Sequence, residues 1–320
     1  MKKYLITGGS GFIGSSLVNK LLSNNHFVRV LDDQSRGNRL QISNNNHFEF
    51  IAGDVRNINT VNQACQNIDS VVHLAFVNGT KYFYEKPELV LEVGVKGMIN
   101  VLDAGKKNHV KELFLASSSE VYQTPPVFPT PENVPLSIPD LYNPRYSYAG
   151  GKIISELLTL YNGSKIFEKI VIFRPHNVYG PQMGYEHVIP ELISKILKLT
   201  TKNNKSISLP IQGDGLSKRS FIYIDDFTDC LYLLLSKSKN RGIYNIGTSK
   251  EVTIQEIIAI LSQITKTSIS IKSTKSPDGS VTRRLPDVHK IKSLGFTPKI
   301  SLKEGLIKTF LWYNDNQITA

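Results

Sequence analysis

The sequence has little of what would indicate a secreted or membrane protein. Only two cysteines, Cys65 and Cys230, occur in 320 residues, so no disulfide framework is expected and a reducing compartment fits. No apolar run approaches the roughly 18 residues of a membrane span. The apolar run that begins near the N-terminus stops at Gly8, too early for the core of a signal peptide. We therefore predict a cytoplasmic protein that does not enter a membrane.

Negative charge is also in short supply. The 27 aspartates and glutamates are outnumbered by 38 lysines and arginines, which leaves a net charge of +11. The basic residues are scattered, without an arginine-rich tract, so we expect no nucleic-acid partner. We interpret the charge as a solvated surface, which would also suit an anionic nucleoside diphosphate. A non-catalytic scaffold that binds NAD or RNA is the alternative from another class, and no metal site is expected.

The chain is organised around a glycine loop. Three glycines, spaced three apart, follow a short apolar run at 4–6 and precede a stretch whose apolar residues share one helical face. A strand, a glycine turn and a helix in this order present free N–H groups to a pyrophosphate. The spacing differs from the standard G-x-G-x-x-G, so an ordinary strand-to-helix turn remains open at this point. The loop residues predicted at the cofactor are Gly8, Gly11, Phe12, Ile13 and Gly14.

Further apolar runs of strand length alternate with helical stretches. They occupy residues 26–31, 48–51, 70–75, 111–116 and 168–173. This alternation predicts an α/β fold with a doubly wound parallel sheet of the Rossmann type, which binds ligands at the carboxyl ends of its strands. The residues at those ends that we predict to contact the cofactor are Asp32, Asp54, Val55, Leu74 and Ala75.

The cofactor is predicted from Asp32, which lies about twenty residues after the glycine loop, where a carboxylate holds a ribose diol. Because this carboxylate would repel a 2′-phosphate, NAD is favoured over NADP. Arg36 and Arg39 lie nearby and leave NADP open. Asp54 could accept a hydrogen bond from the adenine amino group, or could cap the next helix.

The second half of the chain has a looser pattern. Residues 124–144 hold seven of the fifteen prolines, which predicts a long extended loop over the active site. We expect residues 1–175, with a return segment at about 219–248, to form an NAD-binding Rossmann domain. Residues 176–218 and 249–320 are expected to form a smaller C-terminal α/β domain for the substrate.

The candidate chemistry lies in Tyr148 and Lys152, one helical turn apart on the same face. A phenol has a pKa near 10, and a neighbouring ammonium favours its ionised form, so the tyrosine can serve as a base. It would take a proton from a sugar or alcohol hydroxyl while the carbon loses hydride to nicotinamide. The Ser118 hydroxyl could hold the same substrate oxygen, and Lys152 would also bind the nicotinamide ribose. A surface Tyr–Lys pair without function is the alternative.

From end to end the chain resembles an extended short-chain dehydrogenase/reductase of the nucleotide-sugar epimerase/dehydratase family. The matching stretches are the glycine loop, Asp32, Gly53–Val55, His73–Ala75, Ser117–Tyr122, Tyr148-x-x-x-Lys152, Arg174–Pro181 and Gly213–Gly215. The resemblance implies that NAD stays tightly bound and oxidises carbon 4 of a hexose on a nucleoside diphosphate, linked to UDP or GDP. A 4-keto sugar then forms.

The resemblance also implies roles for individual residues. Ser118 would be the hydroxyl partner, Tyr148 the base and Lys152 its activator. Asn177 would contact the sugar or diphosphate, while arginines would pair with the diphosphate in bidentate fashion. The residues expected at the substrate are Ser119, Asn177, Val188, Pro210, Arg219, Arg283 and Arg284, of which Val188 and Pro210 would frame the nucleobase.

The reaction that follows the keto intermediate depends on Ser119 and Glu120. By the resemblance, 4,6-dehydratases typically have Asp-Glu here, the Asp as acid for the departing 6-hydroxyl and the Glu as base at carbon 5. Ser-Glu and the run 283–287 resemble UDP-glucuronate decarboxylases, whereas simple 4-epimerases need no second base. We rank a nucleotide-sugar 4-epimerase first, chiefly on family frequency. A 4,6-dehydratase and a decarboxylase are the alternatives, and Glu120 is either catalytic or structural.

Three departures from the family accompany these matches. Gly94 stands where a long helix usually carries Asn, Gly151 replaces the usual Ser before the lysine, and Gln123 replaces a usual Gly. The long helices expected at about 87–107 and 146–162 resemble the pair that joins family members as dimers. We therefore expect a homodimer.

Overall fold

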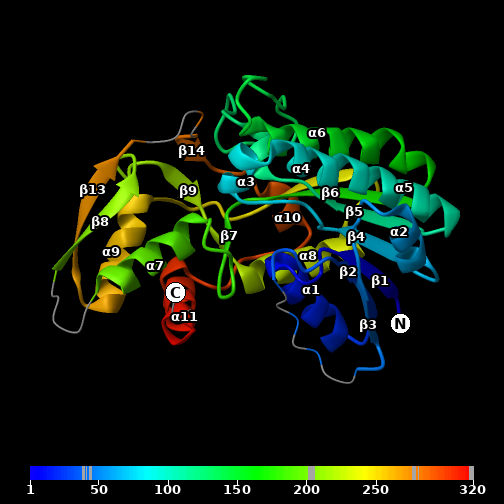
Figure 1. Cartoon of the computed structure of the whole chain (residues 1–320), viewed down its shortest axis with the longest axis horizontal. Helices are drawn as coiled ribbons and strands as arrows, with labels where there is room; N and C mark the ends of the chain where they lie inside the picture. The colour runs from blue at the N-terminus through cyan, green and yellow to red at the C-terminus, as the bar shows by residue number, and fades with distance from the viewer. Residues whose placement is uncertain are drawn as a thin grey trace.

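The computed structural model describes residues 1–37, 40, 42, 45–200, 206–275, 279 and 281–316. Arg39, one of the two arginines that leave NADP open, lies outside these residues. Within them, no helix combines the length and the apolar character that crossing a membrane requires. The chain forms a large lobe around a central sheet and a smaller lobe that contains the C-terminal helix (Figure 1).

A seven-stranded sheet forms the centre of the large lobe, in the order β11-β6-β5-β4-β1-β2-β3. Every neighbouring pair is parallel, which confirms the predicted doubly wound fold. The strands are β1 (Lys3–Thr7), β2 (Phe27–Asp32), β3 (Phe48–Ala52), β4 (Ser70–His73), β5 (Glu112–Ala116), β6 (Lys169–Pro175) and β11 (Gly242–Ile246).

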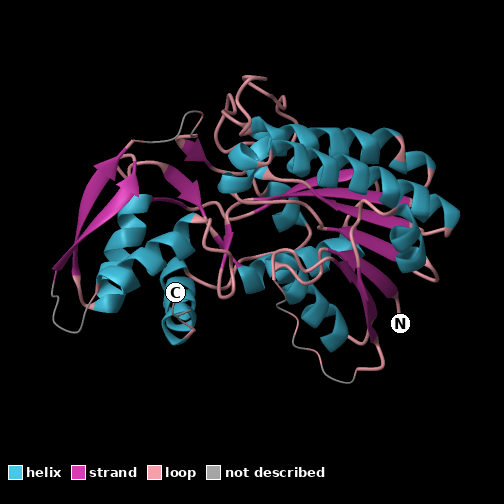
Figure 2. Ribbon diagram, in the orientation of Figure 1, coloured by secondary structure: helices cyan, strands magenta, loops and turns pink. Residues whose placement is uncertain are grey.

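Helices cover both faces of this sheet (Figure 2), which explains why its strands are apolar on both sides. On one face α1 (Phe12–Ser23) packs against α8 (Ile224–Lys237). The other face carries α2 (Ile58–Cys65) and α6 (Tyr146–Tyr161). Successive residues of one strand alternate between the two cores: Ile6 lies among the first cluster and Leu5 among the second.

The long helix expected at 87–107 is continuous but irregular. It comprises α4 (Pro87–Leu91), a five-residue π-helical turn η1 (Glu92–Lys96) and α5 (Gly97–Lys107). α4 and α5 lie beside α6 on the outer surface of the large lobe (Figure 1). A short helix, α3 (Thr80–Glu85), precedes it.

The smaller lobe is assembled from short sheets and helices. Its strands are β7 (Val178–Tyr179) with β10 (Ile222–Tyr223), β8 (Ser206–Gln212) with β13 (Ser268–Thr274), and β9 (Lys218–Ser220) between β12 (Glu251–Thr253) and β14 (Arg283–Arg284). Its helices are α7 (Val188–Leu199), α9 (Ile254–Thr265) and α11 (Leu302–Asp315). The short helix α10 (His289–Ser293) packs instead against β11 of the central sheet. β9 and β10 are separate strands although only Phe221 lies between them, because Ser220 pairs with β12 while Ile222 pairs with β7.

The proline-rich stretch is irregular, as expected for residues 124–144. None of these residues lines either cavity of the site described below, however. Thr130 accepts a backbone hydrogen bond from Asp287 and donates one to Leu285, so the stretch is fixed to the chain that follows β14. Sequence could not show this pairing, because the partners are more than 150 residues apart.

Candidate active site

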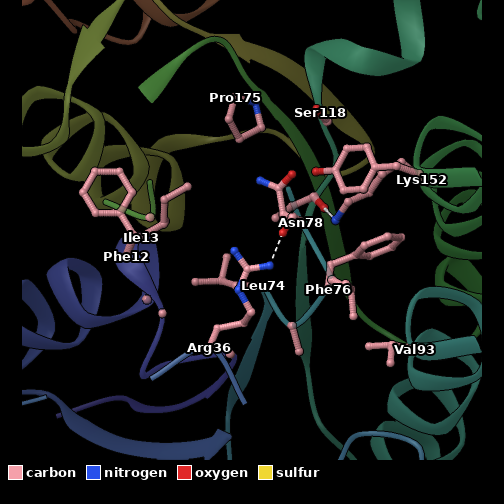
Figure 3. A pocket seen from close by; sticks show the side chains of 18 of the residues that line it. Phe12, Ile13, Arg36, Leu74, Phe76, Asn78, Val93, Ser118, Lys152 and Pro175 are labelled. Atoms are coloured by element: carbon pink, nitrogen blue, oxygen red, sulfur yellow. Dashed lines mark hydrogen bonds between the residues drawn. The ribbon is translucent and has the colours of Figure 1, made fainter. Parts of the chain in front are cut away.

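A cavity of about 370 Å³ opens along the carboxyl ends of the central strands. Figure 3 shows side chains from several segments of the large lobe, among them Phe12, Leu74 and Lys152, converging on it. Every residue predicted at the cofactor lines this cavity. They are Gly8, Gly11, Phe12, Ile13, Gly14, Asp32, Asp54, Val55, Leu74, Ala75, Tyr148 and Lys152.

The glycine loop makes a turn that side chains would block. Gly8 has a φ of +72°, and a Cβ on it would lie 2.7 Å from the Ala75 nitrogen. A Cβ on Gly14 would lie 2.3 Å from the Gly8 carbonyl oxygen. Gly11 caps α1 without a side-chain hydrogen bond, and the first turn carries no acidic residue. The helix N-terminus therefore faces the cavity without a side-chain anion on it, as an anionic ligand requires.

Asp32 is held at the end of β2. Its carboxylate accepts hydrogen bonds from the backbone nitrogens of Ser10, at 2.9 Å, and Gln34, at 2.7 Å. Arg36 reaches across the cavity to the Asn78 carbonyl oxygen and to Glu186, which lies 3.2 Å away (Figure 3). Asp32 is thus fixed in place by backbone donors, as a hydrogen-bond acceptor for a diol would be.

Asp54 forms an ion pair with Arg56. The arginine Nη2 donates to the carboxylate over 2.6 Å, and its Nε donates over 2.9 Å. These hydrogen bonds hold the pKa of Asp54 below its usual range, although burial opposes them. The neighbouring Val55 is buried and supplies an apolar surface where an aromatic base could lie.

The residues present therefore fit a dinucleotide. A turn that admits only glycine leaves room for a pyrophosphate, Asp32 can accept from a ribose, and Asp54 with Val55 can border an adenine. Within the described ranges, no group of three His, Cys, Asp or Glu side chains could hold a metal ion.

Tyr148 and Lys152 lie buried on α6 and face the cavity. Ser118 lines the cavity with them and interacts with the Tyr148 side chain. Lys152 Nζ lies 5.7 Å from the Tyr148 ring centroid and donates to the Ala116 carbonyl oxygen over 2.7 Å. Burial lowers the pKa of Lys152 to about 7, while the negative charge of Glu156 opposes the shift. Burial also raises the pKa of Tyr148, which the interaction with Ser118 partly offsets. A phenolate at this place needs a neighbouring cation.

Glu120 is engaged in an ion pair with Arg284. The two terminal guanidinium nitrogens each donate to one carboxylate oxygen, Nη2 over 2.7 Å and Nη1 at shorter range. Burial alone would raise the pKa of Glu120, but Arg284, with Arg145 and Arg219 nearby, holds that pKa below its usual range. The carboxylate is therefore a poor proton acceptor, and Ser119 beside it has no acidic proton to give.

The substrate residues predicted from sequence fall into two groups. A second cavity of about 280 Å³ adjoins the first. Its lining includes Val188 and Arg219, while Asn177 and Arg284 border both cavities, and Ser119 lines the first together with Glu120. Asn177 has a positive φ of 39° and donates to the Ser220 carbonyl oxygen over 2.9 Å.

Two predicted substrate residues line neither cavity. Arg283 forms an ion pair with Glu251, with its Nε and Nη2 each 2.7 Å from a carboxylate oxygen. Its guanidinium also lies 4.6 Å from the Phe128 ring centroid. Pro210 lies within β8, where its carbonyl oxygen accepts from Lys195 over 3.1 Å.

Sequence reasoning missed Arg145. Arg145 lines the second cavity beside Glu120, and its Nε is buried without a hydrogen-bond partner. Its position three residues before Tyr148 was a usable indication. Phe76 lines the first cavity next to Lys152.

Comparison with known proteins gives a family match that covers most of the chain. Residues 4–247 match the model of the NAD dependent epimerase/dehydratase family. A Methanocaldococcus jannaschii protein assigned as a UDP-glucose 4-epimerase is 34% identical over 325 residues, which cover 98% of this chain and 99% of that protein. A UDP-N-acetyl-alpha-D-glucosaminuronate decarboxylase of Bacillus cytotoxicus is 31% identical, with 98% of each chain covered.

A solved structure adds a third reaction. The dTDP-glucose 4,6-dehydratase of Streptomyces venezuelae, crystallised with NAD, superposes with a TM-score of 0.87 at 27% identity and covers 98% of this chain and 97% of that one. The three proteins are an epimerase, a decarboxylase and a dehydratase on one fold. The reaction must therefore be argued from the residues of the cavity.

Proposed function

The chain belongs to the NAD dependent epimerase/dehydratase family, and we propose that within this family it is a nucleotide-sugar 4-epimerase. The proposal rests on one observation. Glu120, two residues after Ser118, is held in a bidentate ion pair with Arg284. The residues Ser118, Tyr148 and Lys152 lie together at the same end of the cavity. They suit the oxidation of a hydroxyl-bearing carbon.

The first step is proton removal from the sugar. Ser118 and Tyr148 would hold the hydroxyl oxygen on carbon 4, and Tyr148 would take its proton, with Lys152 as the cation that favours the phenolate. Bound NAD would supply the acceptor for the hydride of carbon 4 and the donor for its return. The residues that would hold NAD are the glycine loop, Asp32 and Lys152.

The second step decides the reaction. A 4-keto sugar can lose water from carbons 5 and 6 only if a base removes the proton on carbon 5 and an acid protonates the departing oxygen. Glu120 is engaged by Arg284, and Ser119 is not an acid. Return of hydride to the opposite face of carbon 4, with the proton given back by Tyr148, needs neither group. The sugar must then turn its other face toward the cofactor.

A decarboxylase is the second candidate, because a specific feature favours it. Arg145, Arg219 and Arg284 lie around the single carboxylate of Glu120, which leaves an excess of positive charge where a sugar carboxylate could sit. Loss of CO₂ from a 4-keto uronate needs no base. The substrate, rather than the protein, then determines whether this reaction occurs.

Product identification separates the candidates. The purified protein is incubated with UDP-glucose, UDP-N-acetylglucosamine, UDP-glucuronate and GDP-mannose in turn, and products are identified by NMR. We expect a carbon-4 epimer from a UDP-hexose. A UDP-pentose from UDP-glucuronate would replace the epimerase proposal by the decarboxylase. Absence of bound NAD together with RNA binding that weakens steeply with salt would favour a scaffold instead.

We further propose the organisation of the chain in solution. Residues 1–175 with 219–248 would hold NAD, residues 176–218 and 249–320 the nucleotide sugar, and two copies would pair through α4, α5 and α6. Exposed apolar side chains on these helices support the pairing. They are Leu91, Ile99, Ile154, Leu157 and Tyr161. Light scattering should give the mass of a dimer, and Leu157→Glu should shift it toward a monomer.

A further inference from the structure

Phe76 fills a space that two glycines leave open. It follows β4, and its ring points toward Lys152 and the helix that carries Val93 (Figure 3). A Cβ on Gly94 would lie 2.3 Å from the Phe76 atoms Cε2 and Cζ, and one on Gly151 would lie 3.0 Å from Cζ. The ring and any larger residue at position 94 therefore exclude each other.

The backbone gives no other reason for glycine at these positions. Gly94 and Gly151 lie inside helices, and neither has a positive φ. Glycine is less favourable than alanine in a helix interior. Gly94 also lies in the middle of the π-helical turn η1, a local insertion that occurs frequently at functional sites. The helix thus departs from regular geometry beside this ring.

The ring contacts both members of the proton-transfer pair. Lys152 Nζ lies 3.9 Å from the Phe76 ring centroid, within the range of a cation–π interaction. The Phe76 and Tyr148 rings meet edge to face, with centroids 5.1 Å apart and an interplanar angle of 80°. Phe83 stacks on Tyr148 with centroids 4.7 Å apart. Among the described residues, the hydrogen bond of Lys152 goes to the Ala116 carbonyl oxygen. The Phe76 ring is the nearer of the two aromatic rings beside the ammonium, since the Tyr148 ring centroid lies 5.7 Å away.

We propose that Phe76 is a positioning residue that holds the Lys152 ammonium beside Tyr148, and that Gly94 and Gly151 are small in order to admit its ring. The proposal rests on the proposed function in that Tyr148 and Lys152 move the proton of the sugar hydroxyl. To that pair it adds Phe76, whose ring fits only because positions 94 and 151 are glycines.

The consequence for proton transfer follows from charge. The negative face of an aromatic ring stabilises a buried ammonium, and a charged lysine favours the phenolate. Without the ring, Lys152 loses its proton more easily, and a neutral lysine leaves Tyr148 as a phenol. Fewer molecules then hold the phenolate–ammonium pair, so the maximal rate falls. As the pH rises, the first proton to leave this pair comes from Lys152, and its loss sets the acidic limb of the pH–rate profile. Because the pKa of Lys152 falls without the ring, this limb moves to lower pH.

A thermal-unfolding cycle tests the packing without any substrate. Gly94→Ala should lower the melting temperature, because its Cβ overlaps the Phe76 ring. Phe76→Ala should lower it through the cavity that it leaves. The double variant should melt no lower than Phe76→Ala alone, since the overlap is gone and alanine is the better helix residue. Additive losses would overturn the packing argument.

Gly105→Ala is the matched control for this cycle. Gly105 also lies in a helix and faces an aromatic ring, with its Cβ expected 2.5 Å from Phe167 Cζ. The atoms nearest to its Cβ belong to Phe167 and not to Phe76. The fall in melting temperature caused by Gly105→Ala should therefore simply add to that caused by Phe76→Ala. The proposal would also be contradicted if the melting temperatures of Phe76→Ala with Gly94→Ala and of Phe76→Ala with Gly105→Ala departed equally from additivity.

The pH profile tests positioning. Cofactor reduction is followed by near-ultraviolet absorbance in single turnovers with UDP-glucose, a step that epimerases, dehydratases and decarboxylases share. Phe76→Leu should lower the maximal rate and move the acidic limb down by about 0.5 to 1.5 pH units. Phe83→Leu removes a ring that stacks on Tyr148 and should lower the rate without moving the limb.

An unmoved limb in Phe76→Leu would overturn the proposal. If the unaltered protein reduces no cofactor with UDP-glucose, UDP-N-acetylglucosamine or UDP-glucuronate, the proposed function fails. The unfolding cycle still decides whether the ring and the two glycines form one unit.

Discussion

The two ends of the cavity are built in different ways. At the cofactor end, Gly8 directly follows β1 and Asp32 ends β2, two strands of one regular sheet. At the sugar end, the contacts join distant segments: Glu120 meets Arg284 across 164 positions, and Asn177 binds the Ser220 carbonyl. The first end follows from sheet topology, whereas the second depends on how the smaller lobe packs. Function within the family is therefore decided where sequence is least informative.

The largest effect is expected where the two ends meet, at Tyr148. Tyr148→Phe removes the proton acceptor but keeps the ring between its aromatic neighbours. The turnover of a UDP-hexose should fall by about 1000-fold, while bound NAD and the melting temperature stay close to their original values. Unchanged turnover would refute the role of Tyr148 as the base.

At the sugar end, Arg284→Met should lower the free energy of unfolding by about 2 kcal/mol at neutral pH, because the half-buried carboxylate of Glu120 loses its two charge-assisted hydrogen bonds. In the unaltered protein the pKa of Glu120 is lowered by folding. The pair therefore contributes stability above about pH 4.5, the ordinary value for a Glu, and this contribution is lost as the pH falls below it. The stability difference should shrink at acidic pH in denaturant titrations.

Arg283→Met is the matched control for this substitution. The neighbouring arginine is exposed and pairs with Glu251 outside both cavities. Its removal should leave stability almost unchanged and turnover within about twofold. Equal losses in the two variants would contradict the distinct roles assigned to these adjacent arginines.

At the cofactor end, Gly14→Ala should weaken NAD binding by about 30-fold, since a Cβ would overlap the Gly8 carbonyl oxygen and distortion of the loop costs about 2 kcal/mol. Isothermal titration with NAD after removal of bound cofactor measures the change. Substitution of Ser16 by alanine on the same helix, which breaks a 2.8 Å hydrogen bond to Thr228 on α8, should change NAD affinity far less.

A smaller effect is expected at Asp32. Asp32→Asn keeps the size of the side chain but removes its charge, so NAD affinity should fall by about tenfold and discrimination against NADP should weaken. The same titration with both cofactors measures the two numbers. If the preference for NAD over NADP stayed the same, Asp32 would not be the residue that binds the ribose diol.

The sequence predicted the cofactor end well because each of its features is local. The spacing from the glycine loop to Asp32 requires only a strand, a helix and a second strand, and Tyr148 and Lys152 need only one helix. The proline-rich stretch was placed wrongly, since its backbone partner at 285–287 is distant. The engagement of Glu120 could not be foreseen either, because its partner Arg284 is adjacent in sequence to Arg283, which faces Glu251 instead.

The departures from the family were visible in the sequence, but their meaning was not. Gly94 and Gly151 read separately as two missing side chains. In the structure both border the ring of Phe76, so the two glycines and the ring pack as one unit. Only their juxtaposition in space shows this.

The most direct test of the account is turnover of a UDP-hexose in deuterated water, with the product examined by NMR. If Glu120 pairs with Arg284 and does not remove the proton on carbon 5, the product is the carbon-4 epimer with hydrogen retained at carbon 5. Deuterium at carbon 5, or loss of the oxygen on carbon 6, would show a working second base and contradict the proposed epimerase.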